Sequence, residues 1–582
     1  MNNFNMHLSV TVNNLTSEEG NTVYVSVNPP VTCWLFGYFR HCFSTILFDK
    51  EAAEYAMRLY HQGRLLNEAG DLNGSFLLVL VDERNKCVHI ITDRWGSVPL
   101  YWGQHNGEMF VSDDYWRIVR DIEAQELNRV AVAQLLQFCY VLGTQTLIEG
   151  VWEFPPHAVT SIDYTQEPRV FHNQYWSYKL TEHRHESETE LLDLLAHLFK
   201  NIFEIYANAI QKRKWTAGVP LSGGMDSRFI AWGLSRNNVP VIAYSYGTPG
   251  YGDLELASRV ADFLSIPIKK ITWEDEQAFT GKRHDDLVSL IGSTTKYSHG
   301  IGAYAVNGEC QSTCDVFLPG HSGDFIAGSH VVDYYLHAFN HQLTRLAIGK
   351  VHKSMSDRSL KQLYPWSSGH WNTVQDSFRE TMKVNDDPTI LSLTQRWTTE
   401  QRIRRYTLRE CHTYRSFGYQ VMIPFWDYEV VDFFTGLPRK YLYHQYLYRR
   451  LMQEYIYTGL DAPLSKIDTP KGPILSPKAR ACTPTLFDLA TRISRAGLGR
   501  VLSLAAPSTS SQSPDKRYWY LWYHSPEFRH YFIQLFHQSP QCHEIFDMNI
   551  LNRLVEHATP DFIIEPLYNV ATVAHPAFND YR

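Results

Sequence analysis

Short apolar runs typical of strands alternate with amphipathic stretches typical of helices over residues 217–320, and this alternation constrains the fold more than any other feature. The runs VIAYSYG (241–247), IPIKKITW and DVFLPG (315–320) predict strands, and LELASRVADFL (254–264) predicts a helix. Strands that are joined by helices lie parallel in one sheet. We therefore expect an α/β fold with a parallel sheet, helices on both of its faces, and a mainly helical region after it.

The segment Ser222–Ser227 (SGGMDS) follows the apolar run GVPL and opens a predicted helix. Its two glycines let the backbone approach an anion closely, and its hydroxyls and the N–H groups of the first helical turn point to the same place. The segment therefore predicts a pyrophosphate-binding loop; a glycine turn with a capping side chain is the plainer alternative. Asp226 would repel phosphate unless a divalent cation lay between them, which predicts Mg²⁺.

A second glycine-containing loop, Gly320–Asp324 (GHSGD), follows the last predicted strand of this region. Ligands of open α/β sheets bind beyond the carboxyl ends of the strands, so we expect both loops to face one pocket. Asp324 is then the second candidate ligand for Mg²⁺. The loop is not a serine-hydrolase elbow, because Asp324 stands where that motif requires glycine.

The first part of the chain predicts a different β structure. The apolar run SFLLVLV (75–81), the polar turn DERNK and the run CVHIIT (87–92) predict a hairpin in a buried sheet. The polar segment KLTEHRHESETE then marks a domain boundary near residues 178–190, ahead of a long predicted helix at 191–210.

Taken together, these motifs resemble a known family. SGGMDS, the strand that ends at Gly247, GHSGD and RECHTYRSFGYQVMIPFWDYEVVDFFTGLP resemble the synthetase domain of the asparagine synthetase and β-lactam synthetase superfamily, which includes the lasso-peptide cyclases. Residues 71–102 and 147–176 resemble the second half of its N-terminal glutamine amidotransferase domain. The resemblance implies a shortened, degenerate Ntn-type α/β sandwich in residues 1–180. It also implies an ATP-pyrophosphatase (adenine nucleotide α-hydrolase-like) amidoligase domain with helical additions in residues 190–582.

The resemblance also implies a reaction and the residues that perform it. A carboxylate would attack the α-phosphate of ATP, pyrophosphate would leave, and an amine would displace AMP from the acyl-adenylate. Asp226 and Asp324 match the family's magnesium ligands. The residues that match its nucleotide-binding positions are Leu221, Ser222, Gly223, Gly224, Met225, Asp226, Ser227, Tyr246 and Gly320.

Two further residues match catalytic positions of the family. His321 stands where relatives carry Glu or Tyr, the latter as part of a catalytic pair in β-lactam enzymes, and histidine is suited to take a proton from an attacking amine. The alternative is a hydrogen-bonding loop residue without a catalytic role. Lys471 resembles a late lysine that stabilises charge on the phosphate. It has two alternatives, an ordinary surface lysine or an alignment in which Lys466 takes this place.

Several residues depart from the family pattern. Phe325 and Gln420 stand where asparagine synthetases carry glutamates, which argues against free aspartate and ammonia as substrates. A working glutaminase needs cysteine as its mature first residue, with its own α-amino group as the base. This sequence begins Met-Asn-Asn, and Cys33, in the strand-like run CWLFGYF, would need 32 residues removed to reach that position. We therefore expect the amine to come from a source other than this chain's own glutaminase.

Composition limits the partners. A net charge of −7 on 582 residues argues against nucleic acid and other extended polyanions as ligands. The sequence has no signal peptide and no apolar run long enough to cross a membrane, so we expect a cytoplasmic location and no membrane partner. The expected partners are small-molecule or peptide carboxylates and amines, and a homodimer is left open.

Three versions of the ligase hypothesis fit the sequence: intramolecular cyclisation, amidation of a metabolite, and asparagine synthesis from ammonia or glutamine. The lost glutaminase and Gln420 make the third the least favoured. A hypothesis of another class is a catalytically silent subunit that binds nucleotide, and the intact SGGMDS loop together with Asp324 argues against it.

Overall fold

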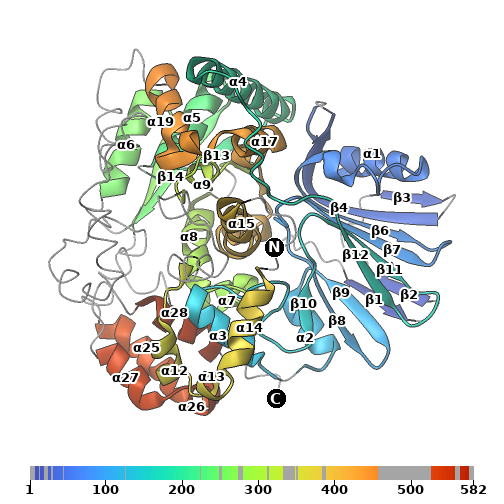
Figure 1. Cartoon of the computed structure of the whole chain (residues 1–582), viewed down its shortest axis with the longest axis vertical. Coiled ribbons are helices and arrows are strands. Elements are labelled where there is room, and N and C mark those ends of the chain that lie inside the picture. The colour runs from blue at the N-terminus through green and yellow to red at the C-terminus, as the bar shows by residue number, and fades with distance from the viewer. Residues whose placement is uncertain are drawn as a thin grey trace.

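The computed structural model describes residues 7–11, 14–18, 24–27, 30–42, 45–124, 126–222, 224–247, 252–272, 280–310, 313–331, 348, 352–382, 389–456, 526–556 and 564–575. Two layered β-sheets form one side of the molecule, and a parallel sheet with many helices forms the other (Figure 1). Within these ranges, no helix combines the length and the apolar character needed to span a membrane.

The N-terminal side consists of two antiparallel sheets. Their strands are β1 (His7–Thr11), β2 (Asn14–Glu18), β3 (Tyr24–Val27), β4 (Pro30–His41), β5 (Leu47–Phe48), β6 (Leu72–Asp82), β7 (Cys87–Thr92), β8 (Tyr101–His105), β9 (Glu108–Ser112), β10 (Val151–Glu153), β11 (Ala158–Asp163) and β12 (Arg169–Gln174). One sheet has the order β10-β8-β9-β1-β2, and the other has the order β12-β11-β7-β6-β4-β3 with β5 paired to β4. The predicted hairpin is confirmed as β6 and β7.

Strand β6 explains why these sheets stack in layers. Its side chains are buried on both faces, because Leu78 and Leu80 pack with helix α1 (Asp49–His61) whereas Leu77 and Val79 pack with the facing sheet. Helices α2 (Tyr115–Asp121) and α3 (Arg129–Phe138) pack against Tyr101 of the first sheet. The resulting helix–sheet–sheet–helix layering is the predicted Ntn-type α/β sandwich.

The second half is built on the predicted parallel sheet. Strands β13 (Ala217–Pro220), β14 (Val241–Gly247), β15 (Ile268–Thr272), β16 (Val316–Phe317) and β17 (Gln420–Val421) lie in the order β15-β14-β13-β16-β17, with every pairing parallel. The helices that accompany it are α4 (Glu188–Lys212), α5 (Met225–Arg236), α6 (Gly252–Leu264), α7 (Lys282–Ile291), η3 (Tyr297–Gly300), α8 (Ile301–Cys310) and α9 (Gly323–Ile326). Helix α4 begins at a capping box formed by Ser187 and Glu190.

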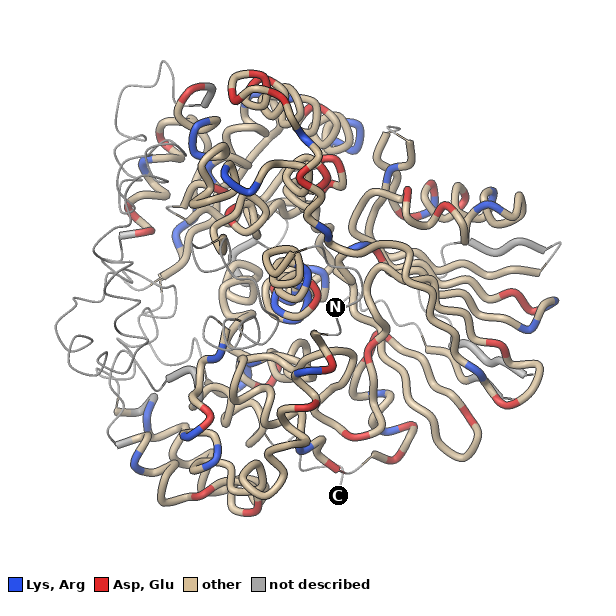
Figure 2. The backbone as a smooth tube through the Cα atoms, in the orientation of Figure 1, with Lys and Arg blue, Asp and Glu red and all other residues tan. Residues whose placement is uncertain are grey.

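The rest of the described chain is mainly helical, as predicted. Its elements are α12 (Asp357–Leu363), α13 (Trp366–Gly369), α14 (Trp371–Glu380), α15 (Ile390–Trp397), the π-helix η4 (Thr398–Thr407), α16 (Arg409–Ser416), η5 (Pro424–Trp426), α17 (Tyr428–Gly436), α18 (Arg439–Leu442), η6 (Tyr443–Gln445), α19 (Tyr446–Leu451), η7 (Met452–Ile456), α25 (Pro526–Gln538), α26 (Pro540–Ile545), α27 (Met548–Glu556) and α28 (Ile564–Ala574). Acidic and basic residues are interspersed along both halves of the molecule (Figure 2).

The two halves share buried contacts. Arg40 of β4 donates a 2.8 Å hydrogen bond to Asp427, and the side chains of Trp95 and Trp426 pack at a centroid distance of 4.4 Å. Helix α3 packs in one hydrophobic cluster with α28 and other C-terminal helices. A division into residues 1–180 and 190–582 stays a prediction.

Candidate active site

The predicted pyrophosphate loop joins β13 to α5 at the carboxyl edge of the parallel sheet. Ser227 Oγ accepts a 3.1 Å hydrogen bond from the backbone N–H of Ser222, and the two hydroxyls lie 3.1 Å apart. Among the described residues, no side chain caps the N-terminus of α5, so the N–H groups of its first turn are left to bind an anion. Gly223 lies outside the described residues.

The second predicted loop lies directly against the first, as expected from the neighbouring positions of β13 and β16. A Cβ atom on Gly320 would lie 2.4 Å from the backbone nitrogen of Ser227, so only glycine fits there without movement of the backbone. The backbone N–H of Asp324 donates a 2.8 Å hydrogen bond to Asp226 Oδ2. The two predicted magnesium aspartates are therefore brought together.

Asp226 has a second neighbour that the sequence did not predict. The hydroxyl of Tyr448, on α19, donates a 3.0 Å hydrogen bond to Asp226 Oδ1. This bond holds the carboxylate oxygen that the backbone of Asp324 does not contact. No motif in the sequence points to Tyr448, because its helix is more than 200 residues away from the loop that it supports.

His321, Glu410 and Tyr246 form a cluster of polar side chains. Its Nε2 atom lies 3.4 Å from Glu410 Oε2, and the hydroxyl of Tyr246 donates a 3.3 Å hydrogen bond to Glu410 Oε1. The side chains of His321 and Glu410 are only 20% and 10% exposed, which keeps their interaction partly screened from water. Glu410 thus links the loop after β16 to the end of β14, and it lies within ion-pair distance of the imidazole.

Glu410 was not predicted as a site residue, although the sequence holds a signal for it. It belongs to the stretch RECHTYRSFGYQV that carries the family resemblance, and it is the acidic residue of helix α16. Its side chain lies on α16, next to the buried Arg409, and not near the conspicuous glycine loops.

The structure shows the positions of Phe325 and Gln420, the two residues that stand where asparagine synthetases carry glutamates. Phe325 is buried and packs against Tyr178, Trp426 and His330, so it contributes to the core. Gln420 begins strand β17, and its amide lies 3.4 Å from Asp49 Oδ1 of the N-terminal sandwich. Its side chain is therefore not at the carboxyl edge of the sheet, and it carries no information about the base used there. Lys471 and Lys466 lie outside the described residues.

Cys33 is an interior residue of a strand. It is the fourth residue of β4, pairs with Tyr24 on one side and with Leu80 on the other, and is fully buried against α1. Burial raises the pKa of the Cys33 thiol to about 12. At neutral pH the group is therefore a protonated core thiol, whereas a nucleophile must be a thiolate.

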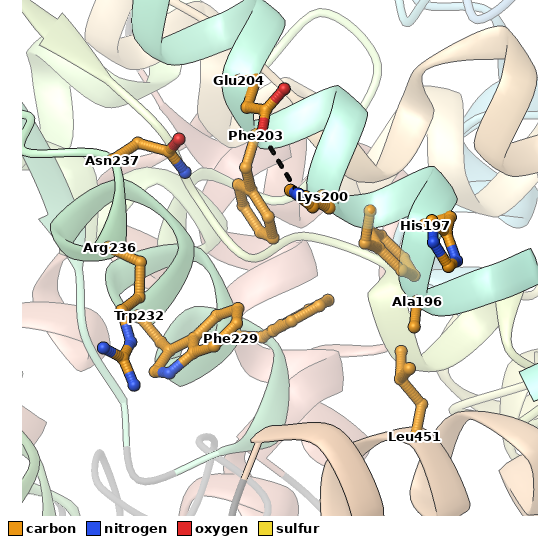
Figure 3. Close-up of a pocket in the computed structure, with 11 residues that line it drawn as sticks. Ala196, His197, Lys200, Phe203, Glu204, Phe229, Trp232, Arg236, Asn237 and Leu451 are labelled. Carbon is orange, nitrogen blue, oxygen red and sulfur yellow. Dashed lines mark ion pairs between the residues drawn. The ribbon is translucent and has the colours of Figure 1, made fainter. Parts of the chain in front are cut away.

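A cavity of about 440 Å³ lies between α4 and α5 (Figure 3). Aromatic side chains from both helices line it, and Leu451 closes one side. None of the residues of the two glycine loops contributes to its lining. The cavity is therefore separate from the candidate active site.

Comparison with known proteins agrees with this architecture. Residues 209–496 match the family described as asparagine synthase, and residues 51–176 match the glutamine amidotransferase domain. The chain belongs to the asparagine synthetase superfamily. The first match contains the parallel sheet and both loops of the site, and the second contains strands β6 to β12 of the sandwich.

The individual relatives are distant. The chain is 24% identical over 216 residues to a probable glutamine-hydrolysing asparagine synthetase of Acanthamoeba polyphaga mimivirus, a match that covers 34% of each protein. It is 21% identical over 334 residues to the glutamine-hydrolysing asparagine synthetase of Mus musculus, covering 53% of this chain and 54% of that enzyme. The chain thus matches about a third and about half of the length of these two relatives.

Solved structures give a weaker likeness. An allosteric regulatory enzyme of purine biosynthesis is 10% identical, with a TM-score of 0.21, over 46% of this chain and 74% of that one. The glutamine phosphoribosylpyrophosphate amidotransferase of B. subtilis, complexed with ADP and GMP, is also 10% identical, with a TM-score of 0.20, over 56% and 71% of the two chains.

Proposed function

We propose that this protein is an ATP-dependent ligase that forms an amide bond. It activates a carboxylate as the acyl-adenylate, releases pyrophosphate, and transfers the acyl group to an amine that is not produced by its own glutaminase. The observation that carries the proposal is the contact between the loops after β13 and β16. There the backbone N–H of Asp324 donates a hydrogen bond to Asp226, and His321 lies in the same loop as Asp324. Membership of the superfamily supports the same class of reaction.

The nucleotide would bind where these two loops meet. The hydroxyls of Ser222 and Ser227 and the first turn of α5 would hold the β- and γ-phosphates, because they combine hydroxyl and N–H donors with the positive end of a helix. Tyr246 and Gly320 would lie along the rest of the nucleotide. An oxygen of the substrate carboxylate would then attack the α-phosphorus, and the bond from that phosphorus to the bridging oxygen would break.

The aspartates fit a divalent cation. Asp226 Oδ2 accepts a hydrogen bond from the backbone N–H of Asp324 and Oδ1 accepts one from Tyr448, and the partly exposed Asp324 adds a second carboxylate at the same place. Carboxylate oxygens are the protein ligands that Mg²⁺ prefers. Asp226 and Asp324 would hold Mg²⁺, which neutralises charge on the phosphates.

His321 would act in the second half-reaction. When the amine nitrogen attacks the acyl carbon and AMP leaves, the nitrogen must lose a proton, and the imidazole of His321 would accept it. Glu410 would orient the ring and stabilise the imidazolium that forms, and the hydroxyl of Tyr246 would hold Glu410 in place. Lys471 would stabilise charge that develops on the phosphate.

The buried thiol of Cys33 supports an external source of the amine. Its backbone pairs within the interior strand β4 and its thiol is protonated, which argues against glutamine hydrolysis at this cysteine. We therefore propose that the amine belongs to the substrate itself or is supplied by another molecule.

The first half-reaction is tested by ATP–pyrophosphate exchange over a panel of amino-acid and sugar-acid carboxylates, with hydroxylamine added separately to trap acyl-adenylates as hydroxamates. We expect at least one carboxylate to support exchange, and Asp226→Asn and Asp324→Asn to abolish it. Asp193→Asn, an exposed aspartate on α4, is the matched control and should leave exchange unchanged. Near-normal exchange in both site variants would contradict the assignment.

The second half-reaction separates His321 from the nucleotide site. We expect His321→Ala and Glu410→Gln each to retain exchange and to lose most of the amide product. Because the two side chains act as one unit, the double variant should lose no more than either single variant. Loss of exchange in His321→Ala would show instead that this residue serves adenylation.

A further inference from the structure

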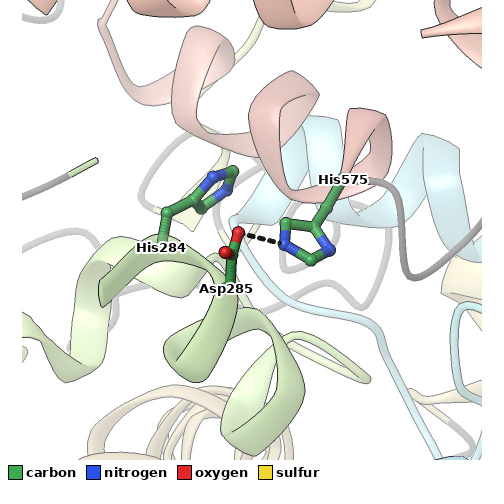
Figure 4. A group of neighbouring side chains, drawn as sticks. All are labelled: His284, Asp285 and His575. Atoms are coloured by element: carbon green, nitrogen blue, oxygen red, sulfur yellow. Dashed lines mark hydrogen bonds and ion pairs between the residues drawn. The ribbon is translucent and has the colours of Figure 1, made fainter. Parts of the chain in front are cut away.

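The contact between α7 and the end of α28 gathers three side chains that bind metals in other proteins. His284 and Asp285 are consecutive on α7, and His575 directly follows α28 (Figure 4). One ligand atom from each lies within 4.8 Å of the other two, and His575 Nε2 lies 2.8 Å from Asp285 Oδ1. The three residues come from segments almost 300 residues apart, so this proximity is a property of the fold and not of a local motif.

His284 is the residue that points to a ligand. It is completely buried, and its Nε2 atom makes no hydrogen bond of good geometry within the described residues, although the backbone of Ala571 on α28 lies close enough to interact with the ring. Its other ring nitrogen, Nδ1, lies 2.9 Å from the hydroxyl of Tyr531 on α25. A buried polar atom without a partner is costly. A ring held at one nitrogen with the other left open is the arrangement found in metal-binding histidines.

The distances are close to those that a metal requires. Bonds of about 2.0–2.1 Å in a tetrahedral site place the ligand atoms about 3.3 Å from one another. His575 and Asp285 would separate slightly from their direct contact, and the longer separations would shorten by small side-chain rotations. Asp285 is 60% exposed, so water can reach a fourth position.

We propose that His284, Asp285 and His575 bind a Zn²⁺ ion. Two imidazoles and one carboxylate favour zinc over Mg²⁺ or Ca²⁺, which prefer oxygen ligands throughout. The ion would join α28 to α7. Helix α7 leads through η3 to α8, whose Gly302 packs directly against the ring of Tyr246. The ion would therefore brace the side of the candidate active site that carries Tyr246, and it would take no part in the proposed ligation.

The test uses the full-length, tag-free protein after dialysis against a chelator. Titration with Co²⁺ should give one equivalent of a tetrahedral site, recognised by its strong visible absorption, and one equivalent of Zn²⁺ should displace it and raise the melting temperature. Asp285→Ala and His284→Ala should each lose the band. Tyr531→Phe should weaken binding about 10-fold, because it removes the group that orients His284.

Two controls identify the site. His530→Ala, an exposed histidine on α25, should keep the full Co²⁺ signal, and Asp226→Asn should keep it too, which distinguishes this site from the nucleotide site. His284→Ala removes a buried side chain and is uninformative if it does not fold. In that case Asp285→Ala, at a largely exposed position, tests whether the Co²⁺ band depends on this cluster. Absence of a tetrahedral Co²⁺ band in the wild-type protein, or its survival in folded Asp285→Ala, would overturn the proposal.

Discussion

Replacing Glu153 with glutamine should destabilise the contact between the N-terminal sandwich and the helices of the second half. Glu153 ends strand β10, and its carboxylate accepts hydrogen bonds from three arginines at 2.7, 2.9 and 2.8 Å: Arg404, Arg405 and Arg409. The exposure of each of these four side chains is 3% or less. One buried carboxylate therefore bonds to three buried guanidinium groups.

The magnitude follows from the carboxyl pKa. Burial by itself would raise the pKa of Glu153, but the three guanidinium groups outweigh it and lower the pKa from its ordinary value of 4.5 to about 2. At about 1.36 kcal/mol for each pKa unit, the charged form is stabilised by about 3 kcal/mol. Removing one partner of a buried ion pair costs about 3–5 kcal/mol in other proteins, a range that includes this value. We expect Glu153→Gln to lower the free energy of unfolding by about 3 kcal/mol.

The sign of the pH dependence is also defined. Because the folded-state pKa of Glu153 is lowered, its contribution is complete above the unfolded-state value of about 4.5 and is lost as the pH falls towards 2. The difference in stability between the wild-type protein and Glu153→Gln should therefore be constant from pH 5 to 8 and should shrink below pH 4.5. A difference that grows on acidification would contradict this account.

Urea unfolding followed by tryptophan fluorescence measures the effect, since Trp95 and Trp426 pack against each other across the same interface. The matched control is Glu544→Gln, which breaks an ion pair with Arg129 whose two side chains are 43% and 34% exposed. Exposed pairs contribute at most about 1 kcal/mol. If Glu153→Gln lost no more stability than this control, the buried cluster would not hold the two halves together.

Two further predictions concern the candidate active site and the amidotransferase-like sandwich. Gly320→Ala should reduce the rate of ATP–pyrophosphate exchange at least about 10-fold, which corresponds to about 1.4 kcal/mol, because its Cβ would lie 2.4 Å from the backbone nitrogen of Ser227. The control is Gly369→Ala, which has open space around it and should not change the rate. Equal rates in the two variants would refute the steric argument. Cys33 should react with iodoacetamide at pH 8 far more slowly than the exposed Cys42, because the Cys33 thiol is buried and protonated. Peptide mass spectrometry measures the two rates, and equal labelling would show that the reagent reaches Cys33.

The parts of the fold that sequence predicted are those set by local pattern. Strands β6, β7 and β14 and helices α4 and α6 follow apolar periodicities that a single segment displays, and each is present close to its expected bounds. Strand β2, with the sequence NLTSE, has no such pattern. It lies at the edge of its sheet, where fewer neighbours impose a side-chain alternation.

The candidate site was predictable to the extent that it depends on strand order. The SGGMDS and GHSGD loops meet because β13 and β16 are parallel neighbours, and parallel neighbours end at the same edge of the sheet. Glu410 and Tyr448 complete the site from helices whose approach depends on tertiary packing, which no local motif encodes. Gln420 shows the converse, because sequence position alone did not indicate that its side chain points towards Asp49.

The buried interface gives the sandwich a structural role that does not depend on catalysis by the sandwich itself. Helix α16 carries Glu410 between two arginines that bond to the sandwich: Arg409 donates to Glu153, and Arg415 donates to the backbone carbonyl of Ser97 and to the hydroxyl of Ser75. Without the sandwich, these guanidinium groups would be exposed at a surface shaped for burial, and the position of α16 would no longer be fixed. The sandwich therefore contributes to the candidate active site through the placement of Glu410, whatever its own chemistry.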